Sequence, residues 1–209
     1  MPKVSTPQLE RYPIYLKYLL TMREEGARTI SAPIIAKELS FSEEQVRKDL
    51  QLVARNQGKP KSGRDIHELI QDIQEFLHYD QLTKAAVVGV GHLGKALMNY
   101  KGFRDFGLEI VCGFDVDASL VGKKENGKEI YNVYQIATKV EELGIEIAIL
   151  ALPAPDAQDI ADRMVNAGVK GIWNFVPVHI KAKEGVIIEN VNLASSFAVL
   201  QHKLRNEEH

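Results

Sequence analysis

The residues with the clearest chemical signature lie in a glycine-rich segment near the middle of the chain. The segment reads Gly89-Val90-Gly91-His92-Leu93-Gly94, follows an apolar run that begins at Ala85, and leads into a helix-forming stretch. Each glycine in this spacing has its own role, with a tight turn at Gly89, close approach of the backbone to a pyrophosphate at Gly91, and helix-on-strand contact at Gly94. The N–H groups that open the following helix then face the phosphates. The spacing therefore predicts a dinucleotide site.

An acid at the end of the next apolar run strengthens this prediction. Asp115 follows the run from Leu108 to Phe114 and lies about 20 residues beyond Gly94. A carboxylate at this point can accept both ribose hydroxyls of adenosine and repels a 2′-phosphate, which favours NADH or NAD+ over NADPH. Two alternatives stay open: a packing turn that binds nothing, and a site for a different adenosine cofactor such as coenzyme A.

Two proline-containing loops further along the chain are candidates for the nicotinamide pocket. They are Ala151-Leu152-Pro153-Ala154-Pro155 and Asn174-Phe175-Val176-Pro177, and each follows a predicted strand. Ligand contacts in a parallel sheet come from loops at the carboxyl ends of the strands. The candidate contacts are Ala151, Pro153, Asn174 and Phe175. On spacing alone, proline-stiffened turns without a ligand are an equally good interpretation.

The elements that must position these loops alternate between strand and helix. A polar stretch at 118–132 suits a surface excursion, 133–143 and 156–167 are helical, and 145–152, 170–175 and 186–189 are apolar β-type runs. This alternation predicts a mostly parallel sheet with helices on both faces, that is, a Rossmann-like α/β domain over residues 85–191. A narrow apolar stripe at helical spacing then predicts a terminal helix from Asn192 to about Arg205, which either covers its own domain or reaches a second copy.

The first 80 residues predict a separate helical domain. Residues 7–25 are helical by spacing, with Pro13 expected to bend or restart the helix, and Ser31 is the expected cap of a second helix through Leu39. Another amphipathic helix is expected from Asp65 to about Tyr79. Residues 81–84 then read as the linker, since helical periodicity ends there.

A third helix in this domain has a basic outer face. Ser42 to Gln45 form a capping box, and Val46, Leu50 and Val53 make an apolar stripe behind the outward-facing cations. Two helices joined by a tight turn, the second of them basic, are typical of a helix-turn-helix or winged-helix domain that enters the major groove. A glycine- and lysine-rich wing follows at 55–64. The candidate DNA contacts are Ser42, Gln45, Arg47, Lys48, Lys59 and Lys61, although such a charge run can also be an ordinary solvated face.

The composition excludes several other classes of protein. The 26 Lys and Arg residues and 28 Asp and Glu residues give a net charge of −2, so any nucleic-acid partner must be met by a local patch. The single cysteine, Cys112, lies inside an apolar run and suits a buried position in a reducing cytosol. We find neither a membrane-spanning run nor a signal-peptide pattern, and we expect a cytoplasmic protein without a membrane partner.

The sequence offers little for catalysis. A dehydrogenase needs a proton donor or acceptor beside the nicotinamide and a cation that binds substrate. His179 is the only plausible base, and no Arg or Lys forms an obvious substrate clamp with it. We therefore expect no catalytic residue, no metal site, and a nucleotide that is sensed rather than consumed. A small NAD-dependent reductase with a helical appendage is the alternative.

With these features, the chain resembles the Rex family of redox-sensing transcriptional repressors from about Lys3 to Arg205. The matching segments are Gln45-Val46-Arg47-Lys48-Asp49-Leu50, the glycine segment with Tyr100, Gly113-Phe114-Asp115, Asn174-Phe175-Val176-Pro177, and the terminal helix. The first of these segments joined to a Rossmann fingerprint is a much more specific signal than either part alone.

This resemblance implies a homodimer in which the terminal helix is exchanged between subunits and packs between the partner's domains. It also implies binding to an AT-rich palindromic operator, release when NADH occupies the nucleotide site, and continued DNA binding with NAD+. On this analogy Arg47 and Lys48 contact DNA, the glycine segment and Asp115 hold the adenosine half, and Tyr100 with the Asn174 loop lies near the nicotinamide.

Three departures from the family pattern bear on these expectations. The family's wing usually begins with a tyrosine-phenylalanine-glycine stretch, whereas this chain reads LVARNQGKPK over residues 52–61. Lys17 stands where an arginine is usual, and Asn192 stands where an aspartate often opens the terminal helix. These three departures bear on the choice of operator and on the preference for NADH over NAD+.

Overall fold

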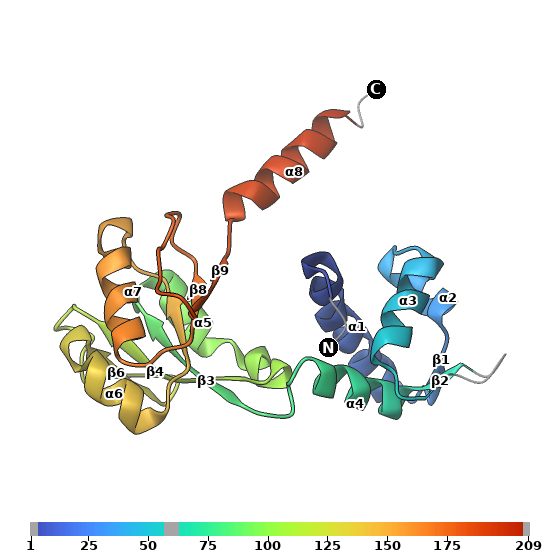
Figure 1. Ribbon diagram of the computed structural model, residues 1–209, viewed down its shortest axis with the longest axis horizontal. Coiled ribbons are helices and arrows are strands. Elements are labelled where there is room, and N and C mark those ends of the chain that lie inside the picture. Colours follow the sequence, from blue (N-terminus) through green and yellow to red (C-terminus); the bar gives the residue numbers. More distant parts are fainter. Residues whose placement is uncertain (1–3, 57–62, 207–209) are drawn as a thin grey trace. The chain divides into compact units, whose positions relative to one another are not determined.

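The chain is divided into two compact units. The computed structural model describes residues 4–56 and 63–206. Unit 1 comprises Met1–Gln81 with Asp105–Gly107, and unit 2 comprises Leu82–Arg104 with Leu108–His209. Figure 1 labels the elements of both units.

Unit 1 is a helical unit with one short ladder. Its described elements are α1 (Thr6–Glu24), β1 (Thr29–Ile30), α2 (Ala32–Leu39), α3 (Glu43–Val53), β2 (Arg64–Asp65) and α4 (Ile66–Phe76). β1 and β2 pair antiparallel, with Ile30 opposite Arg64. Two residues are too few for an alternating pattern, so this ladder was not predicted from the sequence. The core takes large side chains from all four of these helices, among them Tyr12, Leu16, Ile35, Leu50 and Ile73.

Helix α1 continues through Pro13 without interruption. The expected restart at this proline is therefore wrong. An interior proline costs about 3 kcal/mol, because it lacks an N–H group and its ring crowds the preceding turn. Tyr12, Tyr15 and Leu16 on either side of it are fully buried. Burial of such side chains contributes about 2 kcal/mol each, which together exceeds the local cost.

The turn between α2 and α3 sets the start of the basic helix. Ser40 ends α2 in the left-handed conformation, with φ 57°. The Ser42 hydroxyl oxygen then accepts a hydrogen bond from the Gln45 backbone N–H at 3.2 Å. Among these described residues, the return bond from the Gln45 side chain to the Ser42 backbone is not formed, so only half of the expected capping box is present. The apolar stripe of Val46, Leu50 and Val53 is buried as predicted.

Unit 2 carries the strands. Its elements are β3 (Thr83–Val88), α5 (His92–Asn99), β4 (Leu108–Asp115), β5 (Lys124–Glu125), β6 (Lys128–Asn132), η2 (Val133–Gln135), α6 (Ile136–Leu143), β7 (Ile147–Leu150), η3 (Ala154–Asp156), α7 (Ala157–Asn166), β8 (Gly171–Asn174), β9 (Ile187–Asn190) and α8 (Leu193–Asn206). A further short helix, η1 (Lys101–Phe106), supplies residues to both units. β3 begins at Thr83, inside the segment 81–84 that we expected as a linker.

The strands form one sheet in the order β5-β6-β4-β3-β7-β8-β9. All neighbouring pairs are parallel except β5 with β6. The mostly parallel Rossmann-like sheet is thus confirmed. The stretch 118–132 is not the simple surface excursion we expected, since it contains the β5-β6 hairpin. Its turn is Asn126-Gly127, with φ of 50° and 78°, which is the residue pair that tight hairpins favour.

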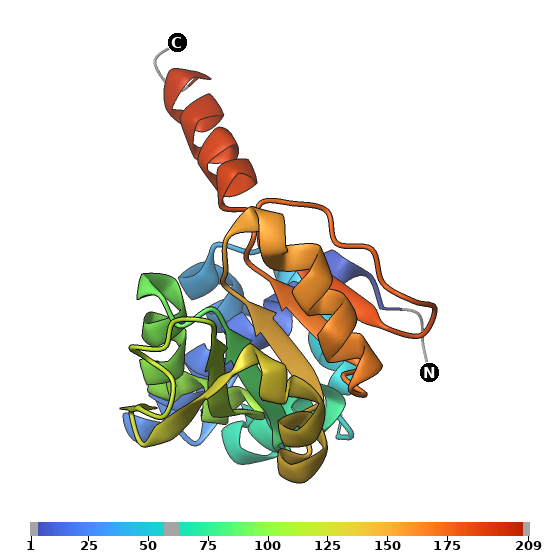
Figure 2. The same cartoon turned by 90° about the vertical axis from the view of Figure 1, so that its left-hand side faces the viewer.

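Alternate residues of β3 face two different cores. Ala86 and Val88 pack with residues of α6 and α7, whereas Ala85 and Val87 pack with Met98 of α5. Figure 2 shows α7 lying along the strands. Cys112 belongs to the first core, and its burial raises the pKa of its thiol to about 12.

The terminal helix α8 has no buried residue. The Asn192 side-chain oxygen accepts a hydrogen bond from the Ser195 backbone N–H at 3.0 Å, so Asn192 caps the helix. The apolar side chains of α8 are more than half exposed: Leu193, Phe197, Val199, Leu200 and Leu204. In this single chain, α8 therefore does not cover its own domain.

Candidate functional site

The glycine segment lies where the strand order reverses. β3 is the central strand, with β4 on one side and β7 on the other. The loops that leave the carboxyl ends of β3 and β7 run in opposite directions, which opens a crevice at this edge of the sheet. Gly89 follows β3, and its N–H donates to the Phe114 carbonyl at 2.9 Å; Ala151 follows β7, and its N–H donates to the Val88 carbonyl at 2.8 Å.

A cleft of about 410 Å³ occupies this crevice. Of the sequence-predicted nucleotide contacts, the structure brings five into its lining: Gly89, Gly91, Asp115, Ala151 and Pro153. Lining residues that were not predicted from the sequence include Tyr134, Asp159 and Arg163. The Arg163 Nε lies 2.9 Å from Asp159, and its guanidinium carbon lies 6.0 Å from the centre of the Tyr134 ring. These three lie on or beside helices α6 and α7, where no motif marked them.

The three glycines differ in the space around them, as their predicted roles require. Gly89 has φ +92°, and a Cβ there would lie 2.5 Å from the Ala151 carbonyl oxygen. At Gly94 a Cβ would lie 1.9 Å from the Gly89 carbonyl oxygen. At Gly91 a Cβ would meet nothing within 4 Å. The first two glycines are needed by the fold, whereas the open space at Gly91 faces the cleft.

Asp115 has a structural role in addition to the predicted one. Its Oδ2 accepts a hydrogen bond from the Val90 backbone N–H at 2.6 Å, and its Oδ1 accepts one from the Asp117 N–H at 2.9 Å. Each carboxylate oxygen can accept two hydrogen bonds, so one acceptor position on each oxygen is still available for a ribose hydroxyl.

The other residues of the glycine segment do not line this cleft. Val90 and Gly94 are buried beneath the turn. His92 and Leu93 are exposed in the first turn of α5. Lys95 donates its N–H to the Gly91 carbonyl at 2.9 Å, which closes that turn. The backbone N–H groups before Lys95 are the ones that a phosphate can use.

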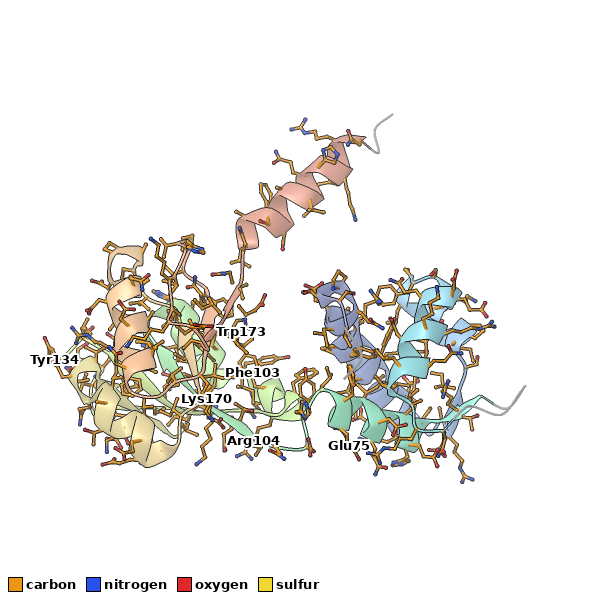
Figure 3. All side chains as sticks on the ribbon, viewed as in Figure 1. Glu75, Phe103, Arg104, Tyr134, Lys170 and Trp173 are labelled. Carbon is orange, nitrogen blue, oxygen red and sulfur yellow. The ribbon has the colours of Figure 1, made fainter. Side chains whose placement is uncertain are left out.

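Tyr100 and Phe175 belong to an aromatic row outside the cleft lining. The row consists of Tyr100, Phe103, Trp173 and Phe175, with successive ring centres 4.8, 5.7 and 5.1 Å apart. Figure 3 shows Phe103 and Trp173 close together, well separated from Tyr134. The sequence predicted Tyr100 and Phe175, at the ends of the row, as nucleotide contacts. It gave no sign that Phe103 and Trp173 lie between them.

Asn174 is directed into the protein and does not line the cleft. Its side chain is 1% exposed. The amide nitrogen donates to the Val178 carbonyl at 3.0 Å and to the Asn190 side-chain oxygen at 2.9 Å, and the amide oxygen accepts from the Val176 N–H at 3.0 Å. Asn174 therefore holds its loop in place.

The candidate DNA-facing side chains of unit 1 lie on α3. The side chains of Arg47 and Lys48 are 62% and 70% exposed. Arg47 pairs with Glu43, and Lys48 pairs with Glu44 at 2.6 Å, each one helical turn earlier. Exposed pairs of this kind contribute little to stability, so phosphates can replace them readily.

The expected wing is described only at its ends. Lys59 and Lys61 lie outside the described residues. Arg55 forms an ion pair with Glu75 and donates its backbone N–H to the Asp72 side chain at 3.1 Å. Two acidic residues of α4 therefore fix the position of Arg55, at the start of the wing. Figure 3 labels Glu75.

No catalytic or metal arrangement is found in the parts of the chain that the structure describes. His179 is exposed and does not line the cleft. Within residues 4–56 and 63–206, His, Cys, Asp and Glu side chains form no group suited to a metal ion. In the same ranges, every helix is too short or too polar to cross a bilayer.

Comparison with known proteins decides the family. The chain is 38% identical over 206 residues to the redox-sensing transcriptional repressor Rex of Bacteroides thetaiotaomicron, which covers 99% of this chain and 93% of that protein. This chain belongs to the Rex family of redox-sensing transcriptional repressors. The expectation of a regulator and not an enzyme is thereby confirmed.

Two protein-family descriptions match parts of the chain. "Putative DNA-binding protein N-terminus" matches residues 3–51, and "CoA binding domain" matches residues 80–178. Solved Rex-family structures match the whole of it. RSP in complex with β-NAD+ and operator DNA superimposes with a TM-score of 0.90, and RSP in complex with β-NADH with 0.88. Both are 31% identical and cover 100% of this chain, and 95% and 97% of RSP.

Proposed function

We propose that this protein is a repressor that binds operator DNA through α3 and is released when NADH occupies the cleft of unit 2. It thereby reads the ratio of NADH to NAD+ in the cytoplasm. The observation that carries this proposal is the presence, in one chain, of a capped helix with exposed Arg47 and Lys48 and of an open glycine-rich cleft at the strand-order reversal.

The nucleotide contacts follow from the cleft. The pyrophosphate lies over Gly91, where no atom stands within 4 Å of a Cβ position, and faces the N–H groups that open α5. The adenosine ribose lies against Asp115. Ala151 and Pro153 form the wall on the β7 side, and the nicotinamide extends from there towards the aromatic row that ends in Tyr100 and Phe175.

The DNA contacts come from the start and outer face of α3. Ser42 opens the helix and Gln45 lies in its first turn, the part of a recognition helix that meets base edges. Arg47 and Lys48 release their glutamate partners and bind phosphate or guanine. The wing cations Lys59 and Lys61 bind the phosphate backbone beside the groove.

The active form is a homodimer, and its two-fold symmetry matches an AT-rich palindromic operator. Two apolar surfaces support the dimer. One is the stripe of α8, and the other is a largely apolar hollow on the sheet, lined by Leu108, Ile147, Trp173 and Ile187 together with Glu189. Ile187 is 75% exposed in the single chain. When two copies exchange α8, the apolar stripe of each α8 packs against the partner and is covered.

The switch has a simple electrostatic basis. Oxidation places a positive charge on the nicotinamide ring, and burying an unpaired charge is costly. A closed pocket therefore favours NADH. A nearly complete shift between the DNA-bound and free forms requires about a 10⁴-fold difference in NADH affinity between them.

The test uses a DNA duplex that the wild-type protein selects from a random-sequence pool. Its affinity is measured at one salt concentration with NAD+ and with NADH. We expect NADH to weaken binding by at least about tenfold. Equal affinities would rule out the switch, and failure to enrich any sequence would rule out operator binding. The Gly91→Ala variant is the matched control, because it should bind the duplex and not respond to NADH.

A second candidate ligand is favoured by one specific observation. The family description that matches residues 80–178 is a CoA-binding domain. Titration calorimetry with NADH and with coenzyme A separates the two, and tighter binding of coenzyme A would replace NADH as the ligand of this cleft.

A further inference from the structure

Asp49 is a buried acid in the middle of the DNA-facing helix. It is 2% exposed and directly follows Lys48 in the chain. The Arg11 Nε lies 2.6 Å from its Oδ2, and the Arg11 Nη2 lies 2.9 Å from its Oδ1. The Tyr15 hydroxyl donates to Oδ2 at 2.8 Å, and the Tyr12 hydroxyl donates to the Asp49 backbone carbonyl at 3.0 Å. We name these four residues the Asp49 clasp.

The hydrogen bonds of the clasp join α3 to α1. Arg11, Tyr12 and Tyr15 all belong to α1. Arg11 also donates to the Pro7 carbonyl at 2.8 Å, so its guanidinium is held from both sides. Its pKa is raised, chiefly by the hydrogen bond to Asp49. A planar guanidinium that grips a carboxylate with two bonds fixes an orientation as well as a distance.

Stability alone is a weak reason for such an arrangement. Replacing a buried ion pair by well-packed apolar side chains is often neutral or stabilising. Most of the unit 1 core is apolar, including Val46 and Leu50 on the same helix, and the other buried acid of unit 1 among the described residues is Asp72 on α4. Apolar contacts are non-directional and let a helix rotate or slide by small amounts, whereas hydrogen bonds with fixed partners do not.

We propose that the Asp49 clasp is a positioning device that sets the rotation of α3 on α1, and with it the aim of Arg47 and Lys48 into the DNA groove. This inference rests on the proposed DNA binding by α3. Side chains reach about 6 Å from a helix axis, so a rotation of about 10° moves their ends by about 1 Å. A shift of that size takes a hydrogen bond to a base edge out of its narrow distance range, but it barely alters the attraction to phosphates.

The experiment measures the ratio of affinities for two duplexes. One is the duplex selected by the wild-type protein, and the other is a scrambled duplex of the same length and composition. The variant is Arg11→Met with Tyr15→Phe and Asp49→Leu, which removes both charges and the hydroxyl together. We expect its melting temperature to stay near that of the wild type and its affinity ratio to fall at least about tenfold, with the scrambled duplex bound as before.

A merely stabilising role predicts a different result. Loss of folded protein weakens binding to both duplexes equally, so the ratio would stay within about twofold of the wild type, and that outcome overturns the proposal. The core truncation Ile73→Ala on α4, at a fully buried position, is the control for lost stability. If the triple variant does not fold, Tyr15→Phe alone decides by the same criterion. A wild-type protein that prefers neither duplex would contradict operator binding itself.

Discussion

The Asp115 carboxylate accepts a 2.6 Å hydrogen bond from the backbone N–H of Val90, and this bond ties the end of β4 to the glycine turn after β3. The acid that is expected to choose between NADH and NADPH therefore also holds the glycine turn in place. These two functions use different acceptor positions on the same carboxylate.

Asp115→Asn is expected to weaken NADH binding about tenfold and to reduce the discrimination against NADPH. The amide keeps one oxygen acceptor, but it no longer repels a 2′-phosphate and presents an N–H₂ group to one of the two backbone donors. Fluorescence titrations with NADH and NADPH measure both effects. Asp117→Asn, two residues away on the exposed surface, is the control, and unchanged selectivity in Asp115→Asn would remove this acid from the site.

Gly91→Ala is expected to lose NADH affinity and keep its stability, whereas Gly94→Ala is expected to lose stability. A Cβ at Gly91 meets nothing within 4 Å, so this variant should melt like the wild type and lose NADH affinity by more than about tenfold. A Cβ at Gly94 would lie 1.9 Å from the Gly89 carbonyl oxygen, so that variant should be strongly destabilised. Thermal melts and NADH titrations check both. Full NADH affinity in a folded Gly91→Ala variant would place the pyrophosphate elsewhere.

Arg47→Ala is expected to weaken operator binding by about 10- to 100-fold while leaving NADH affinity and the melting temperature unchanged. The side chain is 62% exposed, and its pair with Glu43 contributes little to stability. Gel shifts and NADH titrations measure the two affinities. Lys170→Ala, which breaks an exposed pair with Glu146 in unit 2, is the matched control. A parallel fall in NADH affinity would instead make Arg47 a structural residue.

Glu43→Gln is expected to strengthen DNA binding several-fold, because it frees Arg47 and removes a negative charge from the DNA-facing end of α3. The gain should shrink as salt is raised, since it comes from charge. Affinities at a series of salt concentrations provide the measurement. A loss of affinity would mean that Glu43 holds Arg47 in its binding orientation.

Unit 1 is expected to lose stability above about pH 10. Burial raises the pKa of Tyr12 to about 12 and raises that of Tyr15 as well. A raised pKa means that the folded state holds the proton more tightly than the unfolded chain. The stabilisation is therefore complete below the ordinary tyrosine pKa and is lost as the pH rises towards the folded value. Thermal melts across this range check it, and the Tyr15→Phe variant should show a smaller loss. An equal loss in that variant would assign the effect to other groups.

The sequence by itself determined the order of the main helices and of most strands, and the class of each unit. Local rules suffice for that: the serine at Ser42 opens a helix, the spacing of Val46, Leu50 and Val53 marks its buried face, and the three glycines mark a turn between a strand and a helix. These signals act between residues that are close in the chain, so they can be read without knowing the fold. The Asn126-Gly127 hairpin was also readable in this way and was overlooked.

The tertiary structure decided which side chains meet. Tyr134 and Arg163 line the cleft, and Arg11 grips Asp49 across 38 positions of the chain. Asn174 is directed inward to its own loop. No local pattern specifies such pairs, because they depend on how strands are ordered and how helices pack. For the same reason the sequence predicted a bend or restart of the helix at Pro13, whereas α1 runs through Pro13 because its neighbours are buried in the completed core.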